Sequence, residues 1–165
     1  MFSQNTNLLL AFLRDHNTAR SVLDVFNDLY AMFGREIYCR LFPVILTDRG
    51  SEFSNPVPIE QDENDELRSL VFYCNPSAPY QKGGIEVAHE LVRRVLPKGK
   101  SFDDLQQEDI DLMLSHINSY KRGKLNSRSA YQLFNFIYGD DILPKLNIRE
   151  IEANDIVLSP KLLKK

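Results

Sequence analysis

The sequence lacks several features that would place it in a familiar class of protein. It has only two cysteines, Cys39 and Cys74, which lie far apart, so neither a disulfide framework nor a cysteine-based zinc site is expected. The three histidines show no ligand spacing with them. No apolar run is long enough to cross a bilayer, and the N-terminus does not have the basic-then-apolar plan of a signal peptide. A cytoplasmic protein without membrane contact is therefore expected.

A surplus of basic residues is also missing, because the net charge is -3. This charge argues mildly against a nucleic-acid-binding protein. The distribution is uneven: residues 1–68 carry 6 basic and 11 acidic side chains, whereas residues 69–165 carry 14 and 12. A cluster of acids is predicted to lie in a solvated loop, namely Glu60, Asp62, Glu63, Asp65 and Glu66. A local basic surface in the second part is still compatible with phosphate binding.

The order of apolar patterns along the chain predicts an α/β protein. Its 165 residues, 43% of them hydrophobic, suffice for one domain with a real core. Buried strands are predicted at residues 8–13 and 42–46, and a short strand at 70–73. Helices are predicted at residues 18–33 (closed by Gly34), 84–96, 109–120 and 129–138. The pattern is that of an α/β unit with a helical C-terminal addition.

Asp48 follows the predicted strand at residues 42–46. An acid in this position lies at the carboxyl end of its strand, where α/β sheets place their sites. Gly50 would let the backbone turn sharply and leave Asp48 facing a cleft. The alternative is a turn aspartate that caps its own backbone.

Glu86 opens the helix that follows the glycine pair Gly83 and Gly84. The glycines would allow a substrate backbone to approach closely. The alternative is a first-turn glutamate that only stabilises the helix dipole. Asp48 and Glu86 together are the kind of oxygen ligands that divalent cations need for phosphoryl transfer.

Basic residues follow Glu86 along the chain. Arg93, Arg94, Lys98 and Lys100 form a run that would hold a DNA backbone. The alternative is a solvated helix face with an ion pair between Glu90 and Arg93. Residues 120–124 are another phosphate-contacting candidate, although surface lysines need no such role.

Three separated motifs carry a resemblance to a known family. Residues 47–53 read TDRGSEF, residues 80–86 read YQKGGIE, and residues 89–94 read HELVRR. In this order they resemble the catalytic core of bacterial insertion-sequence transposases, in particular the insertion-sequence thirty family of the integrase-like DDE group. Residues 96–103, 124–126 and 130–134 extend the resemblance over nearly the whole chain.

The resemblance implies an RNase H-like fold, the integrase catalytic core, lacking its first strands. Residues 1–100 would be the partial core, 101–140 its helical C-terminal part, and 141–165 a tail. It also implies a Mg²⁺-dependent enzyme (Mn²⁺ possible) with two ions, which cleaves transposon ends and joins them to target DNA in DNA transposition, integration and recombination. Asp48 and Glu86 would be the second and third catalytic, metal-binding acids of the triad. DNA would contact Lys82, Arg93, Arg94 and Lys98.

The sequence departs from this family at the first acid. No Asp or Glu occurs between Met1 and Arg14, and Asp15 falls after its predicted strand. Arg49 stands where asparagine is usual, and the region that recognises transposon ends is absent. We therefore expect an N-terminally truncated transposase that binds metal weakly and has little or no activity alone.

Two alternatives stay open. One is a non-catalytic DNA-binding or dimerising regulator, which would form a homodimer or associate with a full-length transposase. The other is an RNase H-like nuclease that uses Glu52 or Glu90 as its further acid.

Overall fold

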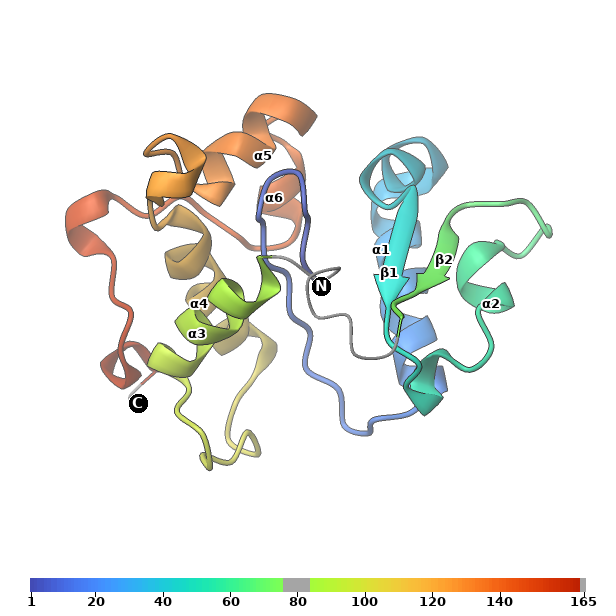
Figure 1. The fold of residues 1–165 in the computed structure, drawn as a ribbon, viewed down its shortest axis with the longest axis horizontal. Helices are drawn as coiled ribbons and strands as arrows, with labels where there is room; N and C mark the ends of the chain where they lie inside the picture. The colour runs from blue at the N-terminus through green and yellow to red at the C-terminus, as the bar shows by residue number, and fades with distance from the viewer. Residues whose placement is uncertain (76–83, 164–165) are drawn as a thin grey trace. The chain divides into compact units, whose positions relative to one another are not determined.

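The computed structural model describes residues 1–75 and 84–163, which fall into two units. Arg14–Lys82 form the first, here called the sheet unit, and Met1–Leu13 with Gly83–Lys165 form the second, called the helical unit. Figure 1 shows two strands with helices in the first unit and a set of helices in the second. Among the described residues, no helix has both the length and the apolar character that crossing a membrane requires.

The sheet unit begins with the long helix α1 (Ala19–Leu41). Thr18 caps this helix, because its hydroxyl accepts a hydrogen bond from the backbone N–H of Ser21 and the Ser21 hydroxyl accepts one in return. The buried side chains of the first turns are those that the helical spacing predicts, namely Val22, Phe26, Leu29 and Phe33.

The prediction that Gly34 ends this helix is only partly correct. Gly34 has φ 73° and ψ 165°, which interrupts the helical backbone, but the helix resumes and continues to Leu41. Tyr38 provides the reason. Its ring is fully buried and its centroid lies 5.1 Å from the ring centroids of both Tyr30 and Phe42. Burial of this aromatic cluster stabilises the second helical segment.

The strands β1 (Val44–Thr47) and β2 (Leu70–Tyr73) form a parallel two-stranded ribbon. Both are predicted from the sequence. The predicted burial of β1 is wrong, because Val44 is 54% exposed, and Phe72 on β2 is exposed to a similar extent, at 53%. Successive side chains of a strand point to opposite faces. Four apolar residues therefore share one exposed face, which we call the ribbon face: Val44, Leu46, Leu70 and Phe72. An apolar run predicts a strand but not whether a second layer covers it.

The acidic stretch after the short helix α2 (Val57–Glu60) is more ordered than the predicted solvated loop. The Asp62 side chain is only 4% exposed and accepts hydrogen bonds from the Tyr30 hydroxyl at 2.8 Å and from Arg35 at 3.0 Å. The hydrogen bond from Tyr30 is the main reason that the pKa of the Asp62 carboxyl lies below its usual value. The prediction is therefore wrong for Asp62. It is also wrong for Glu60, which ends α2 and accepts a hydrogen bond from the N–H of Val71 at 2.8 Å. It is correct for Glu63, which is exposed.

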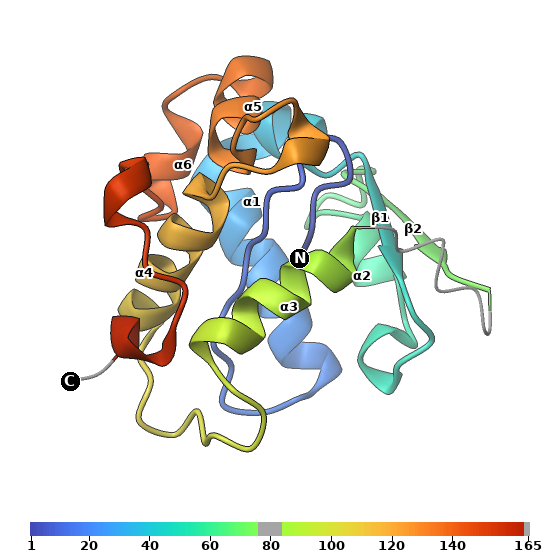
Figure 2. The same cartoon turned by 60° about the vertical axis from the view of Figure 1, so that its left-hand side comes forward.

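Three helices form most of the helical unit: α3 (Ile85–Val95), α4 (Gln107–Ser119) and α5 (Ala130–Tyr138). All three lie where the sequence predicts them, and the short α6 (Ile142–Lys145) follows. Helix α4 packs against both α3 and α5, as Figure 1 and Figure 2 show. The buried apolar residues of α4 are Ile110, Met113, Leu114 and Ile117.

The segment predicted as a buried strand at residues 8–13 is buried only at residues 8–10, and it is not a strand of a sheet. Leu8, Leu9 and Leu10 are at most 7% exposed, and a single bridge pairs Leu9 with Phe2. The backbone N–H and C=O of Leu9 bind instead the side-chain amide of Asn118 on α4, at 2.9 and 2.8 Å. A side chain thus takes the hydrogen-bonding positions that a neighbouring strand would use.

Candidate functional site

Asp48 lies at the carboxyl end of β1, as the sequence predicts. The preceding residue, Thr47, is buried, and its backbone C=O accepts a hydrogen bond from Cys74 at 2.8 Å, whereas Asp48 is exposed. The Oδ1 atom of Asp48 accepts a hydrogen bond from the backbone N–H of Gly50 at 3.3 Å. This bond is that of a turn aspartate. The turn role is therefore present, on a carboxylate that solvent also reaches.

Gly50 does not have the role that the sequence suggests. Its φ of -61° and ψ of 151° are open to any residue, so the expected glycine-dependent sharp turn is wrong. The carboxylate of Glu52 lies over Gly50 instead, since a Cβ at position 50 would be 2.6 Å from Oε2 of Glu52. The turn therefore holds two acids, Asp48 and Glu52, with the exposed Arg49 between them.

Glu86 is exposed in the first turn of α3. Gly84 immediately precedes the helix with φ 91° and ψ -27°, a left-handed conformation that favours glycine. A Cβ at this position would also lie 3.0 Å from the ring of Phe2. Backbone conformation and the contact with Phe2 account for Gly84, so the expected role in admitting a substrate is not needed. Gly83 lies outside the described residues.

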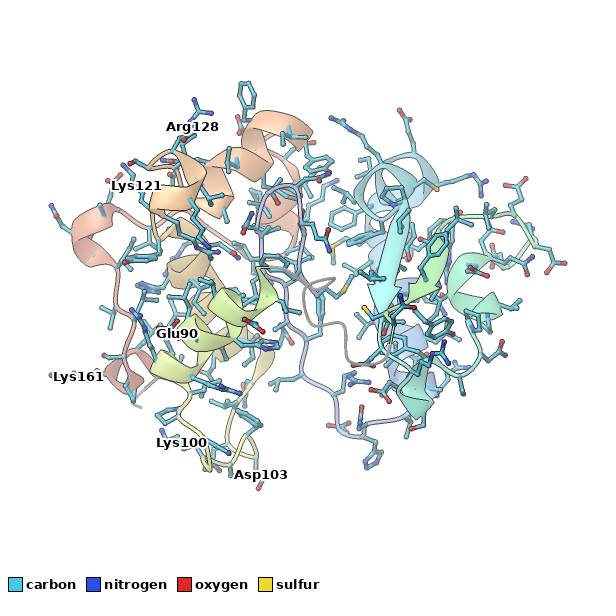
Figure 3. All side chains as sticks on the ribbon, in the orientation of Figure 1. Glu90, Lys100, Asp103, Lys121, Arg128 and Lys161 are labelled. Carbon is cyan, nitrogen blue, oxygen red and sulfur yellow. The ribbon has the colours of Figure 1, made fainter. Side chains whose placement is uncertain are left out.

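Helix α3 turns an apolar face inward and a charged face outward. Its buried residues are Ala88, Leu91 and Val95. The ion pair expected between Glu90 and Arg93 is wrong, because Glu90 pairs with Arg94, one residue further along, at 2.7 Å. Figure 3 shows Glu90 on this helix. Arg93 and Lys98 are exposed, which is compatible with the predicted DNA contact, whereas Lys82 lies outside the described residues.

The two acids of the predicted metal site belong to different units, Asp48 to the sheet unit and Glu86 to the helical unit. Within residues 1–75 and 84–163, no three side chains of His, Cys, Asp or Glu are grouped so as to hold a metal ion. Mg²⁺ needs a nearly octahedral set of oxygen ligands. Neither unit, by its described residues alone, therefore groups three such ligands.

Sequence reasoning missed the unusual state of Arg122, in the loop between α4 and α5. Its side chain is 9% exposed, and the three guanidinium nitrogens are buried without a hydrogen-bond partner in the described part of the chain. Burial lowers the pKa of Arg122. The buried Arg68 of the sheet unit differs, because it donates to two backbone carbonyls and to Asn27. The available sequence signal was the absence of any acid from Leu112 to Gly139.

Replacing Arg122 by methionine is expected to raise the free energy of unfolding by about 1–3 kcal/mol. The substitution removes a buried charge that has no acceptor and keeps much of the side-chain volume. Arg68→Met is the matched control and should lower the free energy of unfolding. It removes the donor from three oxygen atoms that now accept hydrogen bonds from Arg68. Urea unfolding followed by circular dichroism measures both. A loss of stability in Arg122→Met would show that its guanidinium is satisfied in solution.

Comparison with known proteins identifies relatives among curated sequences. No protein-family profile and no solved structure matches the chain. The chain is 28% identical to "Putative integrase ORF3" of Spiroplasma virus SpV1-R8A2 B over 137 residues, which are 81% of this chain and 39% of that protein. It is 35% identical over 63 residues to the transposase for insertion sequence element IS1086 of Cupriavidus metallidurans, covering 38% of this chain and 19% of that protein.

A third relative is the transposase for insertion sequence element IS4351 of Bacteroides fragilis. It is 27% identical over 94 residues, which are 57% of this chain and 28% of that protein. The chain spans about two fifths or less of the length of these relatives. It is thus similar to proteins named as an integrase and as insertion-sequence transposases, each at low identity and over part of its length.

Proposed function

We propose that this chain is part of an insertion-sequence transposase of the DDE type, an RNase H-like enzyme that cleaves and joins DNA in transposition. The observation that carries the proposal is the similarity to the viral integrase over 81% of the chain. The placement of the two acids supports it, because Asp48 follows a parallel strand and Glu86 starts a helix, both with exposed carboxylates. DNA is the proposed partner.

In this proposal Asp48 and Glu86 are the second and third of three metal-binding acids. Arg93, Arg94 and Lys98, together with Lys82, contact DNA. Helix α3 and the residues after it fit this role in part, because Arg93 on the helix and Lys98 beyond its end are exposed. The charge of Arg94 is balanced by Glu90. The assignment of these roles rests on the resemblance of the motifs.

The chain alone is proposed to be inactive. No Asp or Glu occurs from Met1 to Arg14 that could serve as the first ligand, and neither unit groups three ligands among its own described residues. Mg²⁺ in such enzymes activates the attacking oxygen and stabilises the leaving oxygen. We assign no catalytic step to this chain by itself.

Titration with Mn²⁺ in a calorimeter tests the proposed metal role. Binding is expected to be weak, with a Kd in the millimolar range, because a pair of carboxylates gives a hard cation too few anionic ligands. Asp48→Asn should abolish the binding, and Glu63→Gln, which changes an exposed acid of the same unit, should not. Binding that survives Asp48→Asn would refute the metal role of Asp48. Tight binding that Glu52→Gln removes would instead favour a nuclease with Glu52 as its further acid.

The ribbon face favours a second candidate function, a non-catalytic regulator that dimerises or associates with an intact transposase. Val44, Leu46, Leu70 and Phe72 expose apolar surface on two strands, which is typical of a surface that another protein covers. Phe72→Ser should then weaken a complex with full-length transposase in a pull-down, whereas Glu63→Gln should leave it unchanged. No association of the unaltered chain would count against a regulator of this kind.

A further inference from the structure

The loop between α4 and α5 concentrates positive charge without balancing negative charge. We call residues 121–128 the basic loop; its cations are Lys121, Arg122, Lys124 and Arg128. No acid occurs from Leu112 to Gly139, so none lies next to the loop in sequence on either side. The run that begins at Arg93 is different, because Glu90 precedes it and Asp103 and Asp104 follow it. Compared with the run that begins at Arg93, the basic loop therefore has fewer acidic residues near it in sequence to balance its positive charge.

The cations of the basic loop are available to a ligand. Lys121, Lys124 and Arg128 are exposed, and no carboxylate of residues 1–75 or 84–163 forms an ion pair with any of them. Figure 3 shows Lys121 and Arg128 projecting outward from the same part of the helical unit. In contrast, the guanidinium of Arg94 on α3 is already held by Glu90 at 2.7 Å. A phosphate would meet unpaired charges at the basic loop.

The backbone of the basic loop is fixed by its own hydrogen bonds. The N–H of Arg122 donates to the C=O of Arg128 at 3.1 Å, and the N–H of Arg128 donates to the C=O of Leu125 at 3.0 Å. Asn126 and Ser127 take left-handed conformations, with φ 52° and 61°, which close the turn. The side chains therefore emerge from a defined scaffold, so less ordering is needed when a ligand binds.

Arg122 adds a charge beneath this surface. Its guanidinium is buried and has no acceptor in the described residues, unlike that of Arg68, which donates three hydrogen bonds. An arginine in a protein keeps its proton, so the charge persists. Charges in a low-dielectric interior are poorly screened and act over longer distances than exposed ones. An anion above the loop would compensate Arg122 as well as the exposed cations.

We propose that the basic loop, residues 121–128, binds the phosphodiester backbone of duplex DNA. This inference rests on the proposed function and deepens it, because it places the main phosphate contact at Lys121, Lys124 and Arg128 instead of the run along α3. The basic loop itself includes no aromatic side chain, and one exposed ring, Tyr120, adjoins it. A site for single strands stacks successive bases on several such rings, whereas contacts to a duplex backbone need only cations and hydrogen-bond donors.

Salt-dependent binding to a labelled DNA duplex of about 20 base pairs tests the proposal, because each phosphate contact contributes about 0.9 to the slope of log K against log salt. The triple variant K121Q/K124Q/R128Q should lose at least about tenfold in affinity and about 2–3 in slope. The matched triple variant R93Q/K98Q/K100Q should lose less than half as much slope. Replacing Lys121 and Lys124 by arginine should preserve binding. Thermal melting checks that each variant is folded.

A second measurement uses the unaltered chain, so it does not depend on a variant that folds. Bound duplex should protect Lys121 and Lys124 from an amine-reactive reagent more than it protects Lys161, a lysine of the same unit. DNA binding with no such protection, or with an unchanged slope in K121Q/K124Q/R128Q, would overturn the loop assignment and leave the proposed function standing. No DNA binding by the unaltered chain would overturn both. Equal competition by poly-glutamate would show an acidic protein surface as the ligand and overturn the assignment to DNA.

Discussion

In plasmid-nicking and strand-transfer assays with Mg²⁺ or Mn²⁺, the chain alone is expected to give no product above the buffer background. The proposed reason is that one of three acids is missing: the sequence offers Asp48 and Glu86 but no acid from Met1 to Arg14, and neither unit by itself groups three ligands among its described residues. When catalytic residues act as one unit, an enzyme that lacks one of them loses most of its reaction rate. The expected deficit relative to a complete three-acid enzyme is about 10³-fold or more.

The control for this prediction is Asp48→Ala, which should behave like the unaltered chain. Both proteins should also give the same background when the metal is replaced by a chelator. Turnover that requires metal and disappears in Asp48→Ala would contradict the prediction, and it would show that another acid completes the site. Glu52 would be the first to test, because its carboxylate lies over Gly50 in the same turn as Asp48.

Asn118→Ala is expected to lower the free energy of unfolding of the helical unit by about 3–5 kcal/mol. Asn118 is fully buried, and its amide satisfies both the N–H and the C=O of Leu9. Removal leaves two buried backbone groups without partners, each at a cost of about 1–3 kcal/mol, and it also creates a cavity. Urea unfolding followed by circular dichroism measures the loss.

Asn135→Ala is the matched control within the same unit. The Oδ1 atom of Asn135 is buried without a partner in the described chain, so its removal should change the free energy of unfolding by less than about 1 kcal/mol. A loss below about 1 kcal/mol for Asn118→Ala as well would show that the segment around Leu9 is held by other contacts, such as its bridge to Phe2.

The sequence predicts local structure well where one pattern dominates. Helix α5 and strand β2 lie at the predicted residues, because capping at Ser129 and a short apolar run bounded by polar residues are local signals. Burial is less predictable. Residues 8–10 are apolar and buried, yet the backbone of Leu9 bonds to the side chain of Asn118, more than a hundred residues away. Val44 is equally apolar and is 54% exposed, so apolar character alone does not predict burial.

The candidate site shows the same division between local and distant signals. The positions of Asp48 after a strand and of Glu86 at a helix start follow from the sequence around them. The sharp turn expected at Gly50 does not hold, because its backbone is one that any residue adopts and the Glu52 carboxylate lies over it. At Gly84 the contact with Phe2, a residue distant in sequence, limits what the position accommodates, and its expected role toward a substrate stays a prediction. The isolation of Arg122 could not be predicted either, since it depends on which acceptors the fold brings near.

Cleavage of the backbone by Fe²⁺ and peroxide tests the central claim most directly, namely that Asp48 and Glu86 belong to one metal site. Iron bound at a carboxylate generates radicals that cut the chain nearby, and Fe²⁺ accepts the oxygen ligands that suit Mg²⁺ or Mn²⁺. The proposal predicts cuts near both Asp48 and Glu86 at millimolar iron, with both sets lost in Asp48→Asn and in Glu86→Gln. Cuts at one position that persist when the other acid is replaced, or no specific cuts at all, would contradict it.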